Sequence, residues 1–233
     1  MIHNSENTKL SYGFKFYMPI AVLFVVLLLL ANLVVEKLVA IGGGLVLTVG
    51  DFLFPLVYIL DGILTEVYGY AASRRVIWMA LACNILMVIV LSIAIVMPAA
   101  PNWPYQQQFT LIFGRTLQVV IASVVAFLIG EFCNSYILAK LKVFMRGKWL
   151  WLRALSSLAI GQGLDTALFC GIAFWGVLSW RAIFILMATV YCFKLLYEIV
   201  FMPAIYFVAS LLKRIEHVDI YDKKTDFNPF RLK

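Results

Sequence analysis

The sequence predicts an all-α membrane protein, a bundle of about six transmembrane helices with both termini in the cytoplasm. Of its 233 residues, 64% are hydrophobic and only 13% are charged, whereas a soluble domain carries about 25% charged residues. Several apolar stretches also reach the roughly 20 residues that a helix needs to cross the hydrocarbon core. Finally, lysine and arginine are concentrated in alternate connections between these stretches.

The apolar stretches divide into six spans, at roughly 14–36, 48–70, 74–97, 110–139, 150–178 and 182–212. We interpret them as helices, because a backbone in lipid must satisfy its own hydrogen bonds. Runs such as Ala21 to Leu30 lack the period-two alternation of a barrel strand. The first span is longer than the h-region of a signal peptide, roughly 7–15 residues, so we interpret it as the first helix.

Glycine and proline separate the spans. A glycine triplet at 42–44 lies between the first and second spans, and three prolines between 98 and 104 lie before the fourth. Three further prolines fall inside spans and predict kinks there: Pro19, Pro55 and Pro203.

The distribution of basic residues predicts the orientation. One side of the membrane receives only Lys37 and Arg181. The other side receives Lys9, Lys15, Arg74, Arg75, Lys140, Lys142, Arg146, Lys148, Arg153, Lys213 and Arg214. Because basic residues accumulate in cytoplasmic loops, residues 1–13 are expected to be a cytoplasmic N-terminus and 213–233 a cytoplasmic tail. The net charge of +7 is then explained by topology and contact with membrane lipid, without a nucleic-acid partner.

The sequence offers no support for a cofactor, a metal site or an enzyme. His3 and His217 lie outside the spans, and the four cysteines have no regular spacing, so no metal-ligand cluster is predicted. Nucleotide-binding and zinc-protease motifs are also missing from the sequence. If the protein transports a solute actively, an ion gradient or a separate partner must supply the energy.

Ionisable side chains inside the spans are the main candidates for a site, since each is costly unless it is paired or wetted. Gln162 and Asp165 share one face of the fifth span, and Lys194 and Glu198 share one face of the sixth. Consecutive helices are usually neighbours, so we expect Asp165 to meet Lys194. The alternative is that Lys194 and Glu198 form an internal ion pair that only holds helices together.

Further candidates lie on other spans. In the fourth span Glu131 and Asn134 extend a stripe that begins at Ser123, and Asn32 adds an amide in the first span. These groups would line an interior site of mixed charge. Structural roles are favoured for other polar or small residues: Asp51 and Arg115 near span ends, which can reach the interface, and Gly161 with Ser157, which permit close helix packing.

Several motifs resemble those of the queuosine precursor transporter family, which is grouped with the vitamin uptake transporters. The most specific runs from Phe54 through the Leu64–Tyr70 stretch (Leu-Thr-Glu-Val-Tyr-Gly-Tyr) to Trp78. Later signatures are similar around 161–167, 191–194 and 219–230. The resemblance covers nearly the whole chain.

The resemblance implies a six-helix importer of 7-deazapurines, namely preQ0, preQ1 or queuine, which feed the queuosine modification of transfer RNA. A deazaguanine presents N–H donors that a carboxylate such as Asp165 or Glu131 can accept, while its acceptors suit Gln162, Asn32 or Lys194. Its flat ring favours aromatic stacking.

Gating or coupling roles are expected for three other carboxylates inside the spans: Glu66, Asp61 and Glu198. The family commonly reads glycine then aspartate before the Leu-Thr-Glu stretch, whereas this chain reads Asp61-Gly62. A shift of one residue turns a side chain by about 100° on a helix. Asp61 is therefore expected to point away from the site and ranks below Asp165 and Lys194.

Three rival interpretations remain open. The chain could be a substrate-binding subunit for a vitamin-like molecule that needs a separate ATPase, a membrane enzyme, or a scaffold without a ligand. Buried charges argue against the scaffold. The oligomeric state is not set by the sequence, and a homodimer is left open.

Overall fold

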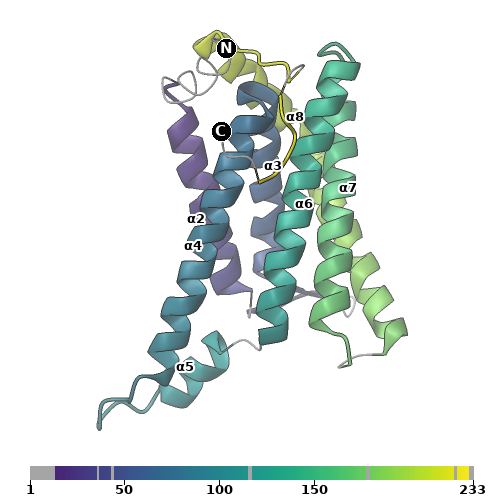
Figure 1. The fold of residues 1–233 in the computed structure, drawn as a ribbon. Coiled ribbons are helices and arrows are strands. Elements are labelled where there is room, and N and C mark those ends of the chain that lie inside the picture. The colour runs from purple at the N-terminus through teal and green to yellow at the C-terminus, as the bar shows by residue number, and fades with distance from the viewer. Residues whose placement is uncertain are drawn as a thin grey trace.

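The computed structural model describes residues 14–35, 37–42, 45–114, 117–176, 179–222 and 225–230. Within these residues the chain is a helical bundle with one small hairpin, so the predicted all-α class is confirmed (Figure 1). The long helices are α2 (Tyr17–Val34), α3 (Gly50–Tyr68), α4 (Tyr70–Val96), α6 (Leu117–Phe144), α7 (Leu150–Ala173) and α8 (Trp180–Glu216).

Five of these helices are long and apolar enough to span a membrane within the described residues: α2, α4, α6, α7 and α8. Their outward faces carry exposed aliphatic and aromatic side chains. The chain is therefore a multi-pass membrane protein. Each of these helices satisfies its backbone internally, as lipid requires.

The sixth long helix, α3, lies at the centre of the bundle (Figure 1). It contains three carboxylates, Asp51, Asp61 and Glu66. It contacts all five of the apolar helices, and 13 of its 19 residues are buried. The surrounding helices shield α3 from lipid, which is why the sequence can place charges on it.

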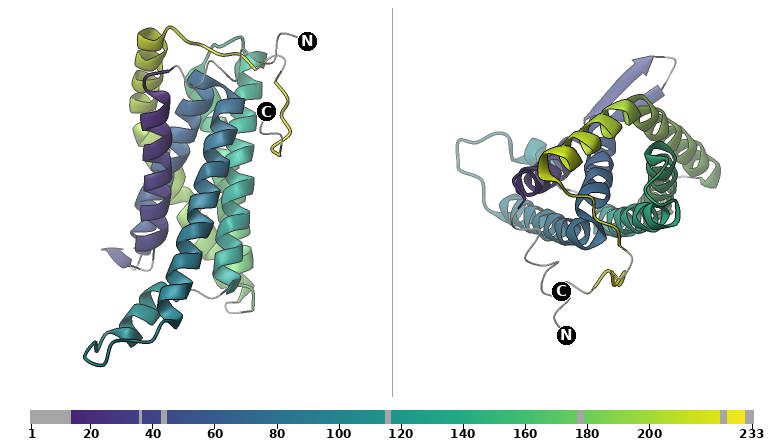
Figure 2. Two further views of the ribbon diagram at one scale, coloured as in Figure 1. Left: turned by 60° about the vertical axis from the view of Figure 1, so that its left-hand side comes forward. Right: turned by 90° about the horizontal axis from the view of Figure 1, so that it is seen from above.

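The bundle has two chemically different ends. At one, which we call the basic end, α2 begins and α8 ends, and the Phe16 amide donates to Glu216 Oε1 at 2.6 Å. Lys142, Arg153 and Lys213 lie there, and the C-terminal segment crosses it (Figure 2). The opposite, hairpin end holds the β-hairpin and α5 (Gln106–Phe113), with Lys37 and Arg181. The first long helix thus begins, and the last one ends, at the same end of the bundle, as the charge pattern predicted.

The connections differ from the sequence prediction in two places. Residues around the glycine triplet form an antiparallel hairpin, β1 (Leu38–Gly42) and β2 (Leu45–Thr48), with Leu38 opposite Thr48. The β-branched and aliphatic residues beside the glycines favour this pairing. The fourth span begins at Leu117 rather than 110, because α5 ends at Phe113 and Gly114 follows it outside any helix. Arg115 lies outside the described residues.

Other boundaries also shift. The fifth span ends at Ala173 rather than 178, and the sixth continues to Glu216. Pro55 and Pro203 lie inside helices as predicted. Pro19 lies in the first turn of α2, where the missing N–H has no helical partner in any case, so the kink predicted there is wrong.

Gly69 alone joins α3 to α4. Its φ of 82° is in the left-handed region, which glycine adopts without steric cost. A Cβ at this position would also lie 2.9 Å from Ile220 Cγ2 of the C-terminal segment. Gly69 therefore permits both the tight reversal between two helices and the seating of that segment.

Helices α6 and α7 approach closely through two glycines. A Cβ on Gly161 would lie 2.9 Å from both the Asn134 Cβ and the Gly130 backbone oxygen. This confirms the packing role that the sequence suggested for Gly161. The close contact brings the polar residues of α6 and α7 to one side of the bundle interior.

Replacing Gly161 with alanine should therefore destabilise the bundle. Overpacking of this kind costs about 1–3 kcal/mol, which thermal unfolding of the purified protein in detergent can measure. Gly171→Ala is the matched control on the same helix, because its Cβ would meet only Met187 Cε at 3.8 Å. Equal melting temperatures for the two variants would contradict the close-packing role.

Candidate functional site

A cavity of about 300 Å³ lies inside the bundle at the hairpin end. It is bounded by α2, β2, α3, α4, α6, α7 and α8. Its lining is mostly apolar with a few polar groups, which is typical of small-molecule sites. The lining residues are Leu28, Asn32, Val35, Leu47, Thr48, Asp51, Phe54, Asn84, Ser123, Phe127, Asp165, Thr166, Phe169, Cys170, Phe174, Leu186, Val190 and Lys194.

An ion pair supplies the charge in this cavity. Lys194 Nζ of α8 donates to Asp165 Oδ2 of α7 at 2.9 Å, and the two side chains are 5% and 14% exposed. Among the described residues Asp165 Oδ1 has no hydrogen-bond partner, so it can accept from a ligand. Lys194 also lies over the ring of Phe54, 5.5 Å from its centroid. The pair thus offers a hydrogen-bond acceptor and a cation beside an aromatic face.

Two buried polar atoms in the cavity lining lack partners in the described structure. They are Asn84 Oδ1 and Thr166 Oγ1. A buried polar atom without a hydrogen bond costs about 1–3 kcal/mol, and a ligand that donates to it would remove that cost. The sequence analysis missed Asn84, although an amide in the middle of an apolar span was visible in the sequence.

The structure places three of the six predicted binding residues at this cavity: Asn32, Asp165 and Lys194. The predicted meeting of Asp165 with Lys194 is confirmed. Asn32 Nδ2 donates to the Leu28 carbonyl at 3.0 Å. Asp51, favoured as structural, exchanges hydrogen bonds with Thr48 at the start of α3 and also borders the cavity.

Gln162 does not line the cavity. It lies one turn closer to the basic end than Asp165 and donates through Nε2 to Glu198 Oε1 at 2.6 Å. Lys194 therefore pairs with Asp165 and Glu198 with Gln162. The alternative of a Lys194–Glu198 ion pair is wrong among the described residues, because both side chains turn towards α7 instead of along α8.

Glu131 and Asn134 also lie outside the cavity lining. Ser123 and Phe127 of the same α6 stripe border it, but the stripe continues towards the basic end. There Asn134 Nδ2 donates to Asp61 Oδ2 at 2.8 Å. The predicted stripe is present on α6. Its first half borders the cavity, and its second half lies deeper in the bundle, near Asp61.

Asp61 points into the bundle interior but does not border the cavity, in line with its expected rank below Asp165 and Lys194. Its side chain is fully buried and accepts hydrogen bonds from Ser73, Asn134 and Ser135. Because α3 has neighbours on every side, a rotation of one residue position still leaves the carboxylate inside the protein.

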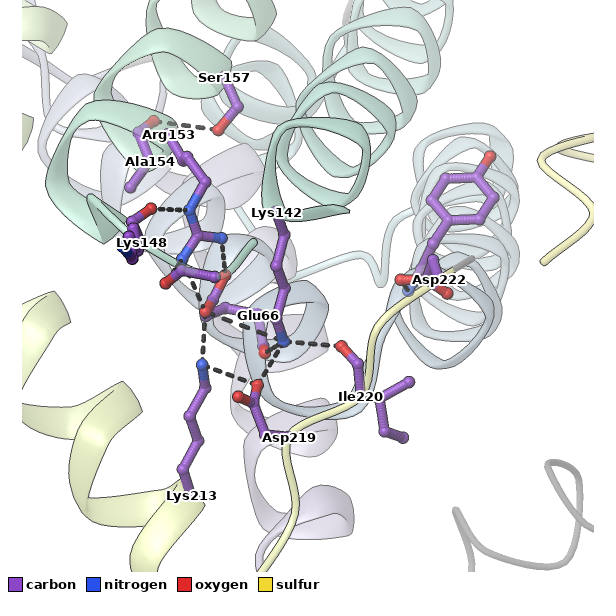
Figure 3. Close-up of polar contacts among 12 residues, drawn as sticks. Glu66, Lys142, Lys148, Arg153, Ala154, Ser157, Lys213, Asp219, Ile220 and Asp222 are labelled. Atoms are coloured by element: carbon purple, nitrogen blue, oxygen red, sulfur yellow. Dashed lines mark hydrogen bonds and ion pairs between the residues drawn. The ribbon is translucent and has the colours of Figure 1, made fainter. Parts of the chain in front are cut away.

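The basic end is closed by a cluster of charges around Glu66 (Figure 3). Arg153 of α7 donates to both Glu66 oxygens, at 2.6 and 3.1 Å, and Lys213 of α8 pairs with Oε1. Lys142 of α6 lies 3.9 Å from the same oxygen and contacts the Glu66 carbonyl. Residues from three helices thus converge on one carboxylate of α3.

The C-terminal segment joins this cluster. Asp219 accepts from Lys142 and Lys213, at 2.6 and 2.9 Å. Partial burial raises the pKa of Asp219, but the hydrogen bonds from the two lysines outweigh it, so the pKa lies below its ordinary value. Beside Glu66 lies a small space of about 10 Å³, lined largely by apolar residues such as Ile63 and Leu158. Among the described residues, ion pairs and apolar side chains thus pack the basic end closely.

The sequence analysis counted Lys142 and Arg153 among the basic residues of the cytoplasmic side. In the structure their side chains are 1% and 0% exposed. Counting basic residues per loop cannot show that two of them turn inward. The signal was Glu66 itself, since a carboxylate one turn from the basic end of a buried helix needs cationic partners.

Comparison with known proteins fits this architecture. The family model described as "Putative vitamin uptake transporter" matches residues 48–208. The chain belongs to this transporter family. The matched region contains the cavity pair, Asp165 and Lys194, and the Glu66 carboxylate.

Two relatives carry a more specific name. A Bacillus subtilis (strain 168) protein named "Probable queuosine precursor transporter" is 27% identical over 190 residues, covering 80% of this chain and 81% of the relative. An Escherichia coli (strain K12) protein named "Queuosine precursor transporter" is 28% identical over 176 residues, covering 72% and 76%. No solved structure matches the chain. This family member is a transporter and not an enzyme, and the resemblance read from its motifs is confirmed.

Proposed function

We propose that this transporter imports queuosine precursors, 7-deazapurines such as preQ0, preQ1 or queuine, for the queuosine modification of transfer RNA. The names of the two relatives support this substrate class. So does the cavity, whose volume of about 300 Å³ falls at the lower end of the range for small-molecule sites. The observation that carries the proposal is the Asp165–Lys194 pair, which lines that cavity with largely buried side chains and one carboxylate oxygen without a partner among the described residues.

The chemistry of a deazaguanine fits the polar groups of the cavity. Its Watson–Crick edge donates N–H groups, which suit Asp165 Oδ1 and Asn84 Oδ1 as acceptors. Its carbonyl oxygen suits Lys194 as a donor. The rings of Phe54 and Phe127 border the same space, and aromatic side chains stack on flat bases at about 1–3 kcal/mol per base.

The arrangement of the two ends supports import by alternating access. In this conformation the cavity lies at the hairpin end, while the Glu66 cluster and apolar side chains close the basic end. We propose that the protein lies in the inner (cytoplasmic) membrane of the cell. Its basic end, with residues 1–13 and 213–233, would then face the cytoplasm. Substrate would enter from outside, and Glu66 would act as a gate whose ion pairs separate when the cytoplasmic side opens.

The substrate assignment has a direct cellular test. The chain is expressed in cells that can neither make nor import deazapurines, and the medium is supplied with preQ0, preQ1 or queuine. Queuosine in transfer RNA should appear with at least one of the three. Unchanged modification with all three, despite expression in the membrane, would remove the assignment.

A second measurement separates a complete transporter from a binding subunit that needs an ATPase. The purified protein alone, reconstituted in liposomes, should take up the base identified in cells. Binding of that base in detergent without any uptake would favour the binding-subunit alternative.

A further inference from the structure

A second polar site lies deeper in the bundle, between the cavity and the Glu66 cluster. It contains two carboxyl groups, Asp61 of α3 and Glu131 of α6, each with 0% exposure. Glu131 lies one turn before Asn134 on α6, and Asn134 Nδ2 donates to Asp61 Oδ2 at 2.8 Å, so the two carboxyl groups are neighbours in the bundle interior. Neither residue borders the cavity.

The two carboxyl groups differ in the hydrogen bonds that they accept. Asp61 accepts from Asn134 Nδ2 at 2.8 Å, from Ser135 Oγ at 2.7 and 2.8 Å, and from Ser73 Oγ. No donor in the described structure reaches either oxygen of Glu131. A fully buried carboxylate with neither a donor nor a cation beside it is strongly disfavoured in its ionised form. The donor pattern assigns the charge to Asp61 and the proton to Glu131.

The surroundings resist loss of that proton. The other titratable groups that face the pair are acidic or phenolic: Tyr58 of α3, Asp165 of α7 and Glu198 of α8 towards Glu131 or Asp61, and Tyr70 of α4 towards Asp61. Within the part of the chain that the structure describes, neither carboxyl group forms an ion pair with lysine or arginine. Two adjacent charges without a cation are strongly disfavoured in a buried site.

Tyr58 connects this pair to the cavity. Its hydroxyl is buried and has no hydrogen-bond partner among the described residues. It lies against Gly130, the residue before Glu131, at the point where a Cβ would also meet Asp165 Cβ at 2.9 Å. Tyr58 and Asp61 lie three residues apart on the same face of α3. Tyr58 therefore lies between Asp165 in the cavity and the carboxyl pair, and it can transmit a change at Asp165 to the pair.

We infer that Asp61 and Glu131 form the proton-binding site that couples this transporter to a proton gradient. This inference rests on the proposed function, whose energy source it supplies. One proton from the outside is carried on Glu131, next to the ionised Asp61, in the conformation seen here. When the Glu66 end opens, water reaches the pair and the proton leaves to the cytoplasm together with the base.

The test uses the purified full chain in liposomes, with radiolabelled base, and compares two assays. Accumulation driven by an acidic exterior requires coupling. Counterflow, the exchange of external labelled base for internal unlabelled base, requires only binding and movement. For one proton per base, accumulation by the wild-type protein should approach about tenfold per unit of pH difference.

Glu131→Gln should abolish accumulation driven by the pH difference and keep counterflow. The amide has the same shape as the protonated acid and can donate to Asp61, so the variant mimics the loaded state permanently. Asp226→Asn makes the same chemical change at an exposed tail residue and should behave as wild type. Asp61→Asn is a second test of the pair if Glu131→Gln fails to fold in detergent.

The outcomes separate the two proposals. Two results would overturn the inference of a coupling site while leaving the substrate assignment intact. One is wild-type accumulation that does not depend on the pH difference, and the other is normal accumulation by Glu131→Gln. A folded Glu131→Gln protein that loses counterflow as well would assign Glu131 to substrate binding and also overturn it. Failure of counterflow by the wild-type protein with all three bases would remove the proposed function and the coupling inference with it.

Discussion

Asp165→Asn is expected to abolish uptake of the deazapurine in cells and in liposomes. The substitution removes the charged acceptor for the N–H groups of the base, and hydrogen bonds to charged groups contribute about 1.5–3 kcal/mol. That range corresponds to a loss of about 10- to 150-fold in affinity. Binding of the labelled base to purified protein measures the loss directly.

The substitution also leaves Lys194 without its partner, 2.9 Å from the altered oxygen, so a control must separate pairing from recognition. The double variant Asp165→Asn with Lys194→Gln removes both charges and the unpaired cation. If the pair only holds α7 against α8, this variant should recover uptake. Recovery would contradict a role in substrate recognition, whereas a folded but inactive double variant supports it.

Glu66→Gln should cause the largest loss of stability. Arg153 and Lys142 are fully buried against this carboxylate, and removal of one partner from a buried pair costs about 3–5 kcal/mol. Thermal unfolding in detergent and the amount of protein in the membrane should both fall.

Asp219→Asn is the matched control for Glu66. Asp219 contacts two of the same cations, Lys142 and Lys213, but its side chain is 42% exposed. Solvent screening limits such a pair to about 0–1 kcal/mol. Comparable losses of stability in the two variants would contradict this, because they would show that the exposed Asp219 stabilises the cluster as much as Glu66 does.

Much of the fold followed from local signals in the sequence. Apolar length located the long helices, and the charge of the loops placed the first and last of them on one side. The β-hairpin and α5 were not predicted, because the glycine triplet and the prolines between 98 and 104 were interpreted only as breaks between spans, although β1 and β2 flank the glycines and α5 follows the prolines.

The site was only partly predictable. Asp165 and Lys194 were paired correctly because consecutive helices pack together and each residue lies near the middle of its helix. Periodicity alone could not show how far along a helix a polar stripe borders the cavity, so Glu131 and Gln162 were grouped with Asp165 and Lys194 although they do not border it. The inward turn of Arg153 depends on Glu66, 87 residues away in the chain. Such pairs are visible only once the helices are assembled.

The central claim is that the cavity at the hairpin end holds the substrate, and protection of a cysteine placed there tests it most directly. Ser123→Cys borders the cavity, while Thr110→Cys on α5 is exposed at the same end and outside it. Each is made in a protein whose native cysteines are replaced by serine. A small thiol reagent is then applied from outside, with and without the base.

The base at ten times its Kd should slow alkylation at position 123 by about tenfold and leave position 110 unchanged. Equal alkylation rates at position 123 with and without base, in a protein that still takes the base up, would show that the substrate binds elsewhere.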